Sequence, residues 1–220
     1  MKLIKYLIIF FTLLIIGIYF YIQIDLNSYF KVKNIITLTD IDKDWINDID
    51  DILKWAREEV NNKTTYKSAY YSWGYPPQNE WVCTDVVWRA LLNAWINLKD
   101  LVDSDIKNNI TFYSRVEWKA DKNIDFRRVP NLDVYLSRKA IKLTNEVLPL
   151  NLENLIEWQP WDIVIFWKPK DHIAIVSDKR NKQWVPYIIH NSAPIPKEND
   201  WLIYWDQNIS PIIGHYRWKY

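Results

Sequence analysis

Hydrophobic residues follow three different patterns along the chain, and each pattern predicts a different kind of element. Residues 6–22 form an uninterrupted apolar run, whereas residues 48–60 and 83–94 place their apolar side chains at helical spacing. In the last third, short runs of β-branched and aromatic residues alternate with turn-like stretches, as in DIVIF, HIAIVSD, VPYIIHN and GHYRW. Helices followed by sequential antiparallel strands predict an α+β fold.

The apolar run is long enough to be a membrane helix, since about 17 to 25 apolar residues span a bilayer. No small-x-small cleavage pattern follows it, which favours an uncleaved signal anchor over residues 1–25 rather than a removable signal peptide. Lys2 and Lys5 before the run favour a cytoplasmic N-terminus. We therefore expect a single-pass membrane protein whose C-terminal domain is extracytoplasmic and follows a tether, residues 26–39, with one short strand.

The charge balance narrows the choice of partners. The 220 residues contain 28 Lys+Arg and 27 Asp+Glu, a formal net charge of +1, and no basic stripe runs along the chain. Nucleic-acid-binding proteins usually carry such a stripe, so we expect no nucleic-acid partner. The length suits one main domain, which we place at residues 40–220.

Cys83 is the only cysteine of the chain, so it cannot form an intrachain disulfide. It lies in the first turn of the helix predicted over residues 83–94, where a helix N-terminus stabilises a thiolate. Two of the three histidines lie on predicted strands: His172 opens one, and His190 closes the next. One imidazole could act as general base for the thiol while the other orients it. The alternative is an inert, buried cysteine.

The motifs GYPP, VCTDVVWRAL, NIDFRRVPN, DIVIF, HIAIVSD, IHN and GHYR together resemble the DUF1287 family, which is grouped with the NlpC/P60-like, papain-type cysteine hydrolases. The similarity covers the chain from about Asp40 to Trp218. It implies a circularly permuted papain-like core in which the helix bearing the cysteine packs on an antiparallel sheet. In that core Cys83 would be the nucleophile, His172 the base and His190 the third polar residue.

The resemblance also implies a reaction, which is carried over from the wider superfamily because the activity of the DUF1287 family is poorly defined. The expected substrate is an amide or peptide bond, most simply in the peptidoglycan of the cell wall, and no cofactor is required. Zinc is disfavoured because neither CxxC nor HExxH spacing occurs, so we assign no metal. The alternative function is a catalytically silent cell-wall-binding or interaction module on the same fold.

Two tyrosines upstream of the cysteine are candidates for holding the oxyanion of the reaction. In NlpC/P60 enzymes a tyrosine in this region assists the backbone N–H of the cysteine, and Tyr71 and Tyr75 are the candidates here. A tyrosine in such a proline-rich loop can also serve packing alone. His215, the third histidine, is expected to be structural.

Asp85 lies two residues after Cys83, where a carboxylate pointing at the sulfur would oppose thiolate formation. We therefore expect it to pair elsewhere, with Arg89, Arg127 or Arg128. The arginine pair 127–128 within IDFRR is equally consistent with substrate binding and with a structural ion-pair cluster.

Tryptophan and glycine usage deviate strongly and in opposite directions. The chain has 14 tryptophans and 3 glycines, whereas average usage would give about 15 glycines. Several tryptophans stand where a turn favours glycine. Our hypothesis is that the source organism reads UGA as glycine; the alternative is a genuinely Trp-rich protein with an aromatic glycan-binding surface. The expected glycines are Trp45, Trp55, Trp73, Trp81, Trp95, Trp161, Trp167 and Trp184; Trp118 and Trp201 are left open, and Trp88, Trp158, Trp205 and Trp218 are expected to be genuine.

Overall fold

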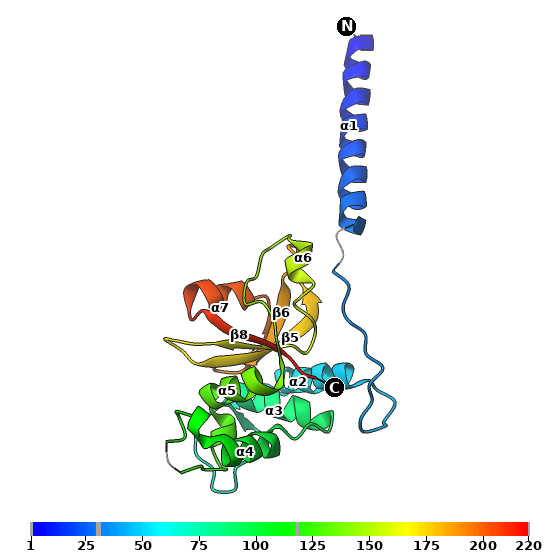
Figure 1. Ribbon diagram of the computed structural model, residues 1–220. Coiled ribbons are helices and arrows are strands. Elements are labelled where there is room, and N and C mark those ends of the chain that lie inside the picture. The colour runs from blue at the N-terminus through cyan, green and yellow to red at the C-terminus, as the bar shows by residue number, and fades with distance from the viewer. Residues whose placement is uncertain (1, 30–31, 118, 220) are drawn as a thin grey trace. The chain divides into compact units, whose positions relative to one another are not determined.

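The computed structural model describes residues 2–29, 32–117 and 119–219, in two compact units, Met1–Lys33 and Asn34–Tyr220 (Figure 1). The described part of the first unit holds the long helix α1 (Lys2–Tyr29). In the described part of the chain, no helix has the length and hydropathy that a membrane span requires, so the transmembrane helix expected over residues 1–25 is not found.

The second unit is built around a six-stranded antiparallel sheet with the strand order β3-β8-β4-β5-β6-β7. Its central strands are the β-branched runs of the sequence, and a short parallel pair stands apart from it. The bounds of the sheet strands are β3 (Ile141–Lys142), β4 (Ile163–Phe166), β5 (His172–Arg180), β6 (Pro186–Asn191), β7 (Pro196–Asn199) and β8 (Ile212–Arg217), and the parallel pair is β1 (Thr65–Tyr66) and β2 (Glu80–Trp81).

Most helices of this unit lie on one side of the sheet, and α6 and α7 lie on the other side (Figure 1). Isoleucines at alternate positions of β4 and β5 point into a core shared with the helices, as the two-residue period of a strand requires. The helices are α2 (Asp48–Asn62), α3 (Cys83–Asn93), α4 (Leu98–Asn109), α5 (Val129–Lys139), α6 (Leu152–Leu155) and α7 (Leu202–Asn208), with the 3-10 turns η1 (Ile110–Phe112) and η2 (Asp125–Arg127).

The α+β class is confirmed, and so are the helices expected at residues 48–60 and from Cys83 onward. Helix α3 packs on β5 and β6, so the helix bearing the cysteine lies on an antiparallel sheet as expected. The short strand expected in the tether is wrong for residues 32–39, which are described and form no strand. Strand β7 and helix α7 were not predicted, because neither PKEN nor LIYWDQN shows a decisive period.

Among the described residues, four tryptophans adopt the left-handed backbone conformation that favours glycine: Trp45, Trp95, Trp161 and Trp184, with φ between 57 and 76°. All four are among the expected glycines. Trp95 is the clearest case, because it occupies the position after the C-cap of α3 in a Schellman motif. Its N–H donates to the Leu92 carbonyl at 3.0 Å, and the next N–H, of Ile96, donates to the Leu91 carbonyl at 2.9 Å.

The other expected glycines lie in different environments. Trp81 is buried in β2, whereas Trp73 is exposed in a turn and Trp55 lies within α2. Trp118 lies outside the described residues. The decoding hypothesis therefore has backbone support at four positions, and reading UGG codons at Trp161 and Trp184 would refute it there.

We expect Trp95→Gly to stabilise the chain as written by about 1 kcal/mol, because glycine adopts the left-handed conformation without the steric cost that a Cβ carries. The Trp95 side chain is 72% exposed, so its removal forfeits little packing. Urea unfolding would measure the change. The matched control is Trp88→Gly within the buried face of α3, which should cost about 3 kcal/mol or more; stabilisation by both changes, or by neither, would contradict the backbone explanation.

Candidate active site

Cys83 begins helix α3 and is 7% exposed. Burial raises the pKa of its thiol to about 12, although the backbone N–H groups of Ile173, Thr84 and Cys83 itself act in the opposite direction. The Ile173 contact places the sulfur against the start of strand β5, one residue after His172. The helix N-terminus thus lies where the sequence predicts it, but burial outweighs its effect on the thiol.

Asp85 is held by three partners, although its charge still raises the pKa of the Cys83 thiol. The Arg127 guanidinium donates to both of its oxygens, at 2.7 and 2.8 Å, and the Trp88 indole N–H donates at 2.8 Å. The Val82 N–H, directly before the cysteine, donates to Oδ2 at 2.8 Å. Asp85 therefore pairs with one of the three arginines proposed for it and fixes the start of α3, so Arg127 is a structural residue.

His172 and His190 form a direct pair: Nε2 of His172 lies 2.7 Å from Nδ1 of His190. The Trp205 ring of α7 stacks on His172 with centroids 4.1 Å apart and meets His190 edge-on. Burial, reinforced by the charge of His190, lowers the pKa of His172 well below its usual value, and burial lowers the pKa of His190 to about 4. Both imidazoles are therefore neutral at neutral pH.

The two parts of the site meet without a direct bond. Among the described residues, Cys83 and His172 share no hydrogen bond, and the contact between the two segments runs through the backbone N–H of Ile173. Because His190 occupies Nε2 of His172, the ring nitrogen left for a reacting group is Nδ1. The site holds a protonated thiol and a neutral base.

An open cavity of about 720 Å³ lies over the histidine pair and is lined by His172, Asn191, Lys197, Trp201 and Tyr66 among others. Its walls come from the ends of β5 and β6, from β7 and α7, and from β1. Since these segments lie far apart in the sequence, the cavity exists only in the folded chain.

Tyr66 is a site residue that the sequence analysis missed. Strand β1 pairs Tyr66 with Trp81 of β2, two residues before the cysteine, and the Tyr66 N–H donates to the Pro194 carbonyl at 3.0 Å. Burial and then the charge of Cys83 raise the pKa of the Tyr66 hydroxyl, and Tyr66 lines the same cavity as His172. The sequence places Tyr66 upstream of Cys83, but it places Tyr71 and Tyr75 there as well, and these two are closer to the cysteine.

Those two tyrosines are positioned elsewhere. The Tyr71 hydroxyl donates to Glu80 at 2.8 Å, and its ring lies under the Arg127 guanidinium. Tyr75 packs against Trp88, with ring centroids 4.9 Å apart. Neither tyrosine lines the cavity beside His172, so Tyr66 replaces both as the candidate oxyanion donor.

The remaining candidates are also structural. Arg128 donates to Asp125 at 3.1 Å, and Arg89 lies between the rings of Trp81 and Trp88. The buried His215 is bonded to Asp162 at 3.0 Å and to the Thr144 carbonyl at 2.7 Å, as expected of a structural histidine.

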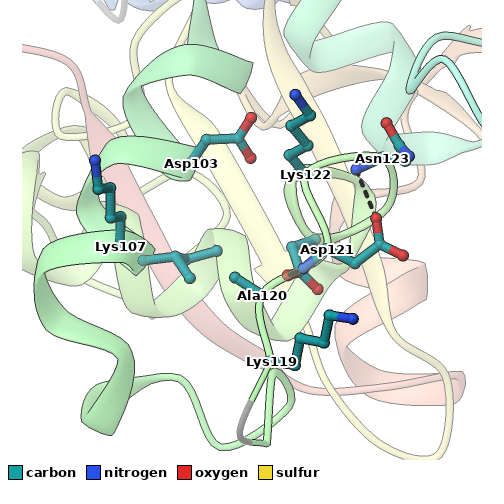
Figure 2. A pocket seen from close by; sticks show the side chains of 9 residues that line it. Asp103, Lys107, Lys119, Ala120, Asp121, Lys122 and Asn123 are labelled. Atoms are coloured by element: carbon teal, nitrogen blue, oxygen red, sulfur yellow. Dashed lines mark hydrogen bonds between the residues drawn. The ribbon is translucent and has the colours of Figure 1, made fainter.

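A second cavity, of about 750 Å³, lies between α4 and the loop that follows residue 118 (Figure 2). Lysines and aspartates both line it, including Asp103 and Lys107 of α4 and Lys119, Asp121 and Lys122 of the loop. It contains neither Cys83 nor a histidine, so it offers neither a thiol nor an imidazole base.

Comparison with known proteins gives a family but no activity. The family model described as "Domain of unknown function (DUF1287)" matches residues 53–218. The chain is 35% identical over 173 residues to the uncharacterized protein YijF of Escherichia coli (strain K12). The aligned region covers 74% of this chain and 78% of YijF. No solved structure matches the chain.

We expect the histidine pair to make the fold acid-sensitive. An unfolded histidine binds a proton near pH 6.5, whereas folded His190 binds one only near pH 4, so acidification between these values favours unfolding. The free energy of unfolding should fall by about 3 kcal/mol between pH 7 and pH 4 because of His190 alone. Urea unfolding at a series of pH values would measure this fall in stability, and the His190→Gln variant should lack it. The same pH dependence of stability in the unaltered chain and in His190→Gln would contradict the role given to His190.

Proposed function

Because the chain belongs to the DUF1287 family, whose description assigns no activity, we propose its function from the site: a cysteine hydrolase that cleaves an amide or peptide bond, with peptidoglycan peptide as the substrate class. The proposal includes membership of the NlpC/P60-like, papain-type superfamily. One observation carries it: a helix N-terminus bearing the lone cysteine abuts the strand that starts with a His172–His190 pair bonded at 2.7 Å.

The mechanism follows from the protonation states. His172 takes the thiol proton on Nδ1 as the Cys83 sulfur attacks the substrate carbonyl carbon, while Nε2–H of His172 donates to Nδ1 of His190. The negative charge that develops on the carbonyl oxygen is stabilised by the Cys83 backbone N–H and the Tyr66 hydroxyl.

The second half of the reaction returns the site to its starting state. The C–N bond breaks, and the proton on Nδ1 of His172 goes to the leaving amine, which leaves an acyl group on the sulfur. Water then loses a proton to His172 and attacks this thioester, and the proton passes back to the sulfur as the carboxylic acid leaves. Because burial keeps His172 neutral before the reaction, it can accept the proton at neutral pH.

The same fold could instead serve as a catalytically silent cell-wall-binding module. The observation that favours this second candidate is the buried thiol, whose pKa of about 12 makes Cys83 a poor nucleophile until a base removes its proton. A binding module would keep ligand affinity when Cys83 is replaced and would release no product.

The decisive experiment incubates the chain with purified muropeptides and follows the products by mass. Cys83→Ala should lower the rate at least about 10³-fold, and Tyr66→Phe should lower kcat about 10-fold or more by removing an oxyanion donor. The matched control is Tyr71→Phe, which removes a hydroxyl bonded to Glu80 and should leave kcat unchanged. Equal turnover by the Cys83→Ala and unaltered chains would exclude the cysteine mechanism.

We also propose that the apolar run 6–22 attaches the chain to the membrane, with the second unit outside the cytoplasm. The support is the sequence of this run and its flanking lysines. The full chain should sediment with membranes and resist extraction by carbonate, and protease added outside the cytoplasmic membrane should digest the second unit. A chain recovered in the soluble fraction would refute this part of the proposal.

A further inference from the structure

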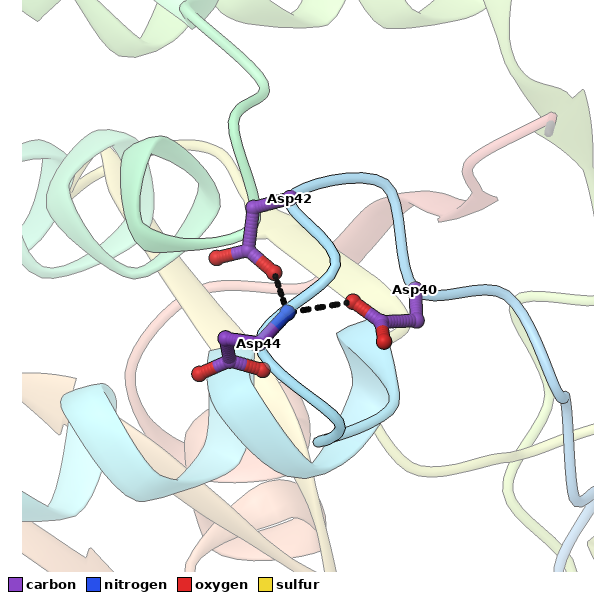
Figure 3. A group of neighbouring side chains, drawn as sticks. All are labelled: Asp40, Asp42 and Asp44. Carbon is purple, nitrogen blue, oxygen red and sulfur yellow. Dashed lines mark hydrogen bonds between the residues drawn. The ribbon is translucent and has the colours of Figure 1, made fainter.

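Three aspartates gather at alternate positions in the loop before α2. The ligand atoms of Asp40, Asp42 and Asp44 all lie within 4.8 Å of one another (Figure 3). The Asp44 N–H donates at 3.2 Å to both Asp40 and Asp42, and the Trp45 N–H donates to Asp40 at 3.0 Å. Three carboxylates held this close repel one another unless a cation neutralises them.

Two buried carboxylates, those of Asp48 and Asp51, follow directly in the first turn of α2. Asp48 is fully buried, and one of its oxygens accepts from the Ile41 N–H at 3.0 Å, so its side chain faces the loop. Asp51 is 2% exposed. Among the described residues, Oδ2 of Asp48 and Oδ2 of Asp51 have no hydrogen-bond partner. An unpartnered carboxylate oxygen at this depth is costly, which indicates a ligand that the protein atoms do not supply.

Asp51 lies close to the cluster of loop carboxylates. Burial raises the pKa of Asp51, and the charges of Asp44 and Asp42 are the next largest causes. The sequence from Asp40 to Asp51 reads DIDKDWINDIDD, so the five carboxylates occupy positions 1, 3, 5, 9 and 12 of a twelve-residue loop.

We propose that residues 40–51 form a calcium site in which Asp40, Asp42, Asp44, Asp48 and Asp51 and the Ile46 carbonyl are the ligands. Calcium loops of the helix–loop–helix type use positions 1, 3, 5, 7, 9 and 12, with oxygen ligands at about 2.3–2.6 Å from the ion. Two ligands of one ion can then be at most about 5 Å apart, a limit that the loop aspartates meet.

Position 6 of such a loop turns sharply and is normally glycine. Here it is Trp45, whose φ of 76° is the conformation that glycine supplies, and whose side chain is 95% exposed. The backbone thus has the turn that the site needs. If the source organism reads UGA as glycine, residue 45 would be the glycine that the loop pattern requires.

The site would act on the fold rather than on the reacting atoms. Its last two carboxylates belong to α2, and α2 packs on α3, the helix that begins with Cys83. Bound calcium neutralises the carboxylates at the start of α2 and should stabilise the folded chain by mass action. This role is independent of the proposed cysteine chemistry.

The test is calorimetric titration of the full chain with calcium chloride after treatment with a chelator. We expect one saturable site per chain and a rise of several degrees in the unfolding midpoint with saturating calcium. Asp51→Asn and the double change Asp42→Asn with Asp44→Asn should each weaken calcium binding at least tenfold. The matched control is Asp50→Asn, because Asp50 is exposed on the same helix and bonds to Asn47. The calcium affinity of this variant should stay within twofold of that of the unaltered chain.

Three results would overturn the site. These are no saturable binding up to about 10 mM calcium, which is weaker than extracellular calcium modules; equal weakening by Asp50→Asn; and equally tight binding of magnesium, which prefers a smaller octahedral site. Circular dichroism of the double variant, whose two loop residues are not buried, shows whether the fold is kept. Titrating Cys83→Ala in parallel separates this site from the proposed hydrolase, since calcium binding should be unaltered.

Discussion

The position of Cys83 depends on one buried ion pair, between Asp85 and Arg127. The side chains are 0% and 2% exposed, and the guanidinium also donates to the Ala69 carbonyl at 2.9 Å. Asp85 holds the Val82 N–H, and the Thr84 hydroxyl donates to the Arg127 carbonyl. One pair therefore joins the start of α3, the loop before it and η2. Because a buried ion pair gains little net stability once its desolvation is counted, we regard its main effect here as geometric.

The sequence predicted the elements whose hydrophobic period is strong and failed where position depends on tertiary contacts. Helix α3 could be located because Val86, Val87 and Leu91 repeat at helical spacing, and β5 because HIAIVSD is β-branched. The contact of Trp205 with His172 could not be anticipated, since α7 is short and its period is weak. Tyr66 was missed for a related reason: only the pairing of β1 with β2 places it opposite Trp81, two residues before the cysteine.

The calcium site proposed for residues 40–51 is difficult to predict from the sequence because Trp45 stands at the position where such loops have glycine. Asp48 and its neighbours are consistent with a favourable charge at a helix N-terminus, and that simpler interpretation accounts for the first turn of α2. With glycine at position 45 the alternation of aspartates would have read as a calcium loop, but tryptophan there breaks the pattern. The backbone keeps the left-handed turn at Trp45, as it does at the helix end of Trp95 and in the hairpin of Trp184.

The protonation states of the candidate site favour one route of the proposed reaction over another. Burial raises the pKa of Cys83 and lowers that of His172, so both changes oppose a preformed thiolate–imidazolium pair. In the proposed reaction the proton would then move during attack, when the developing oxyanion would gain its hydrogen bonds and the substrate would exclude water from the cavity. The stacked Trp205 restrains the His172 ring and limits its solvation, while His190 holds its Nε2. The same burial that makes Cys83 a weak nucleophile in the proposed reaction thus keeps His172 neutral.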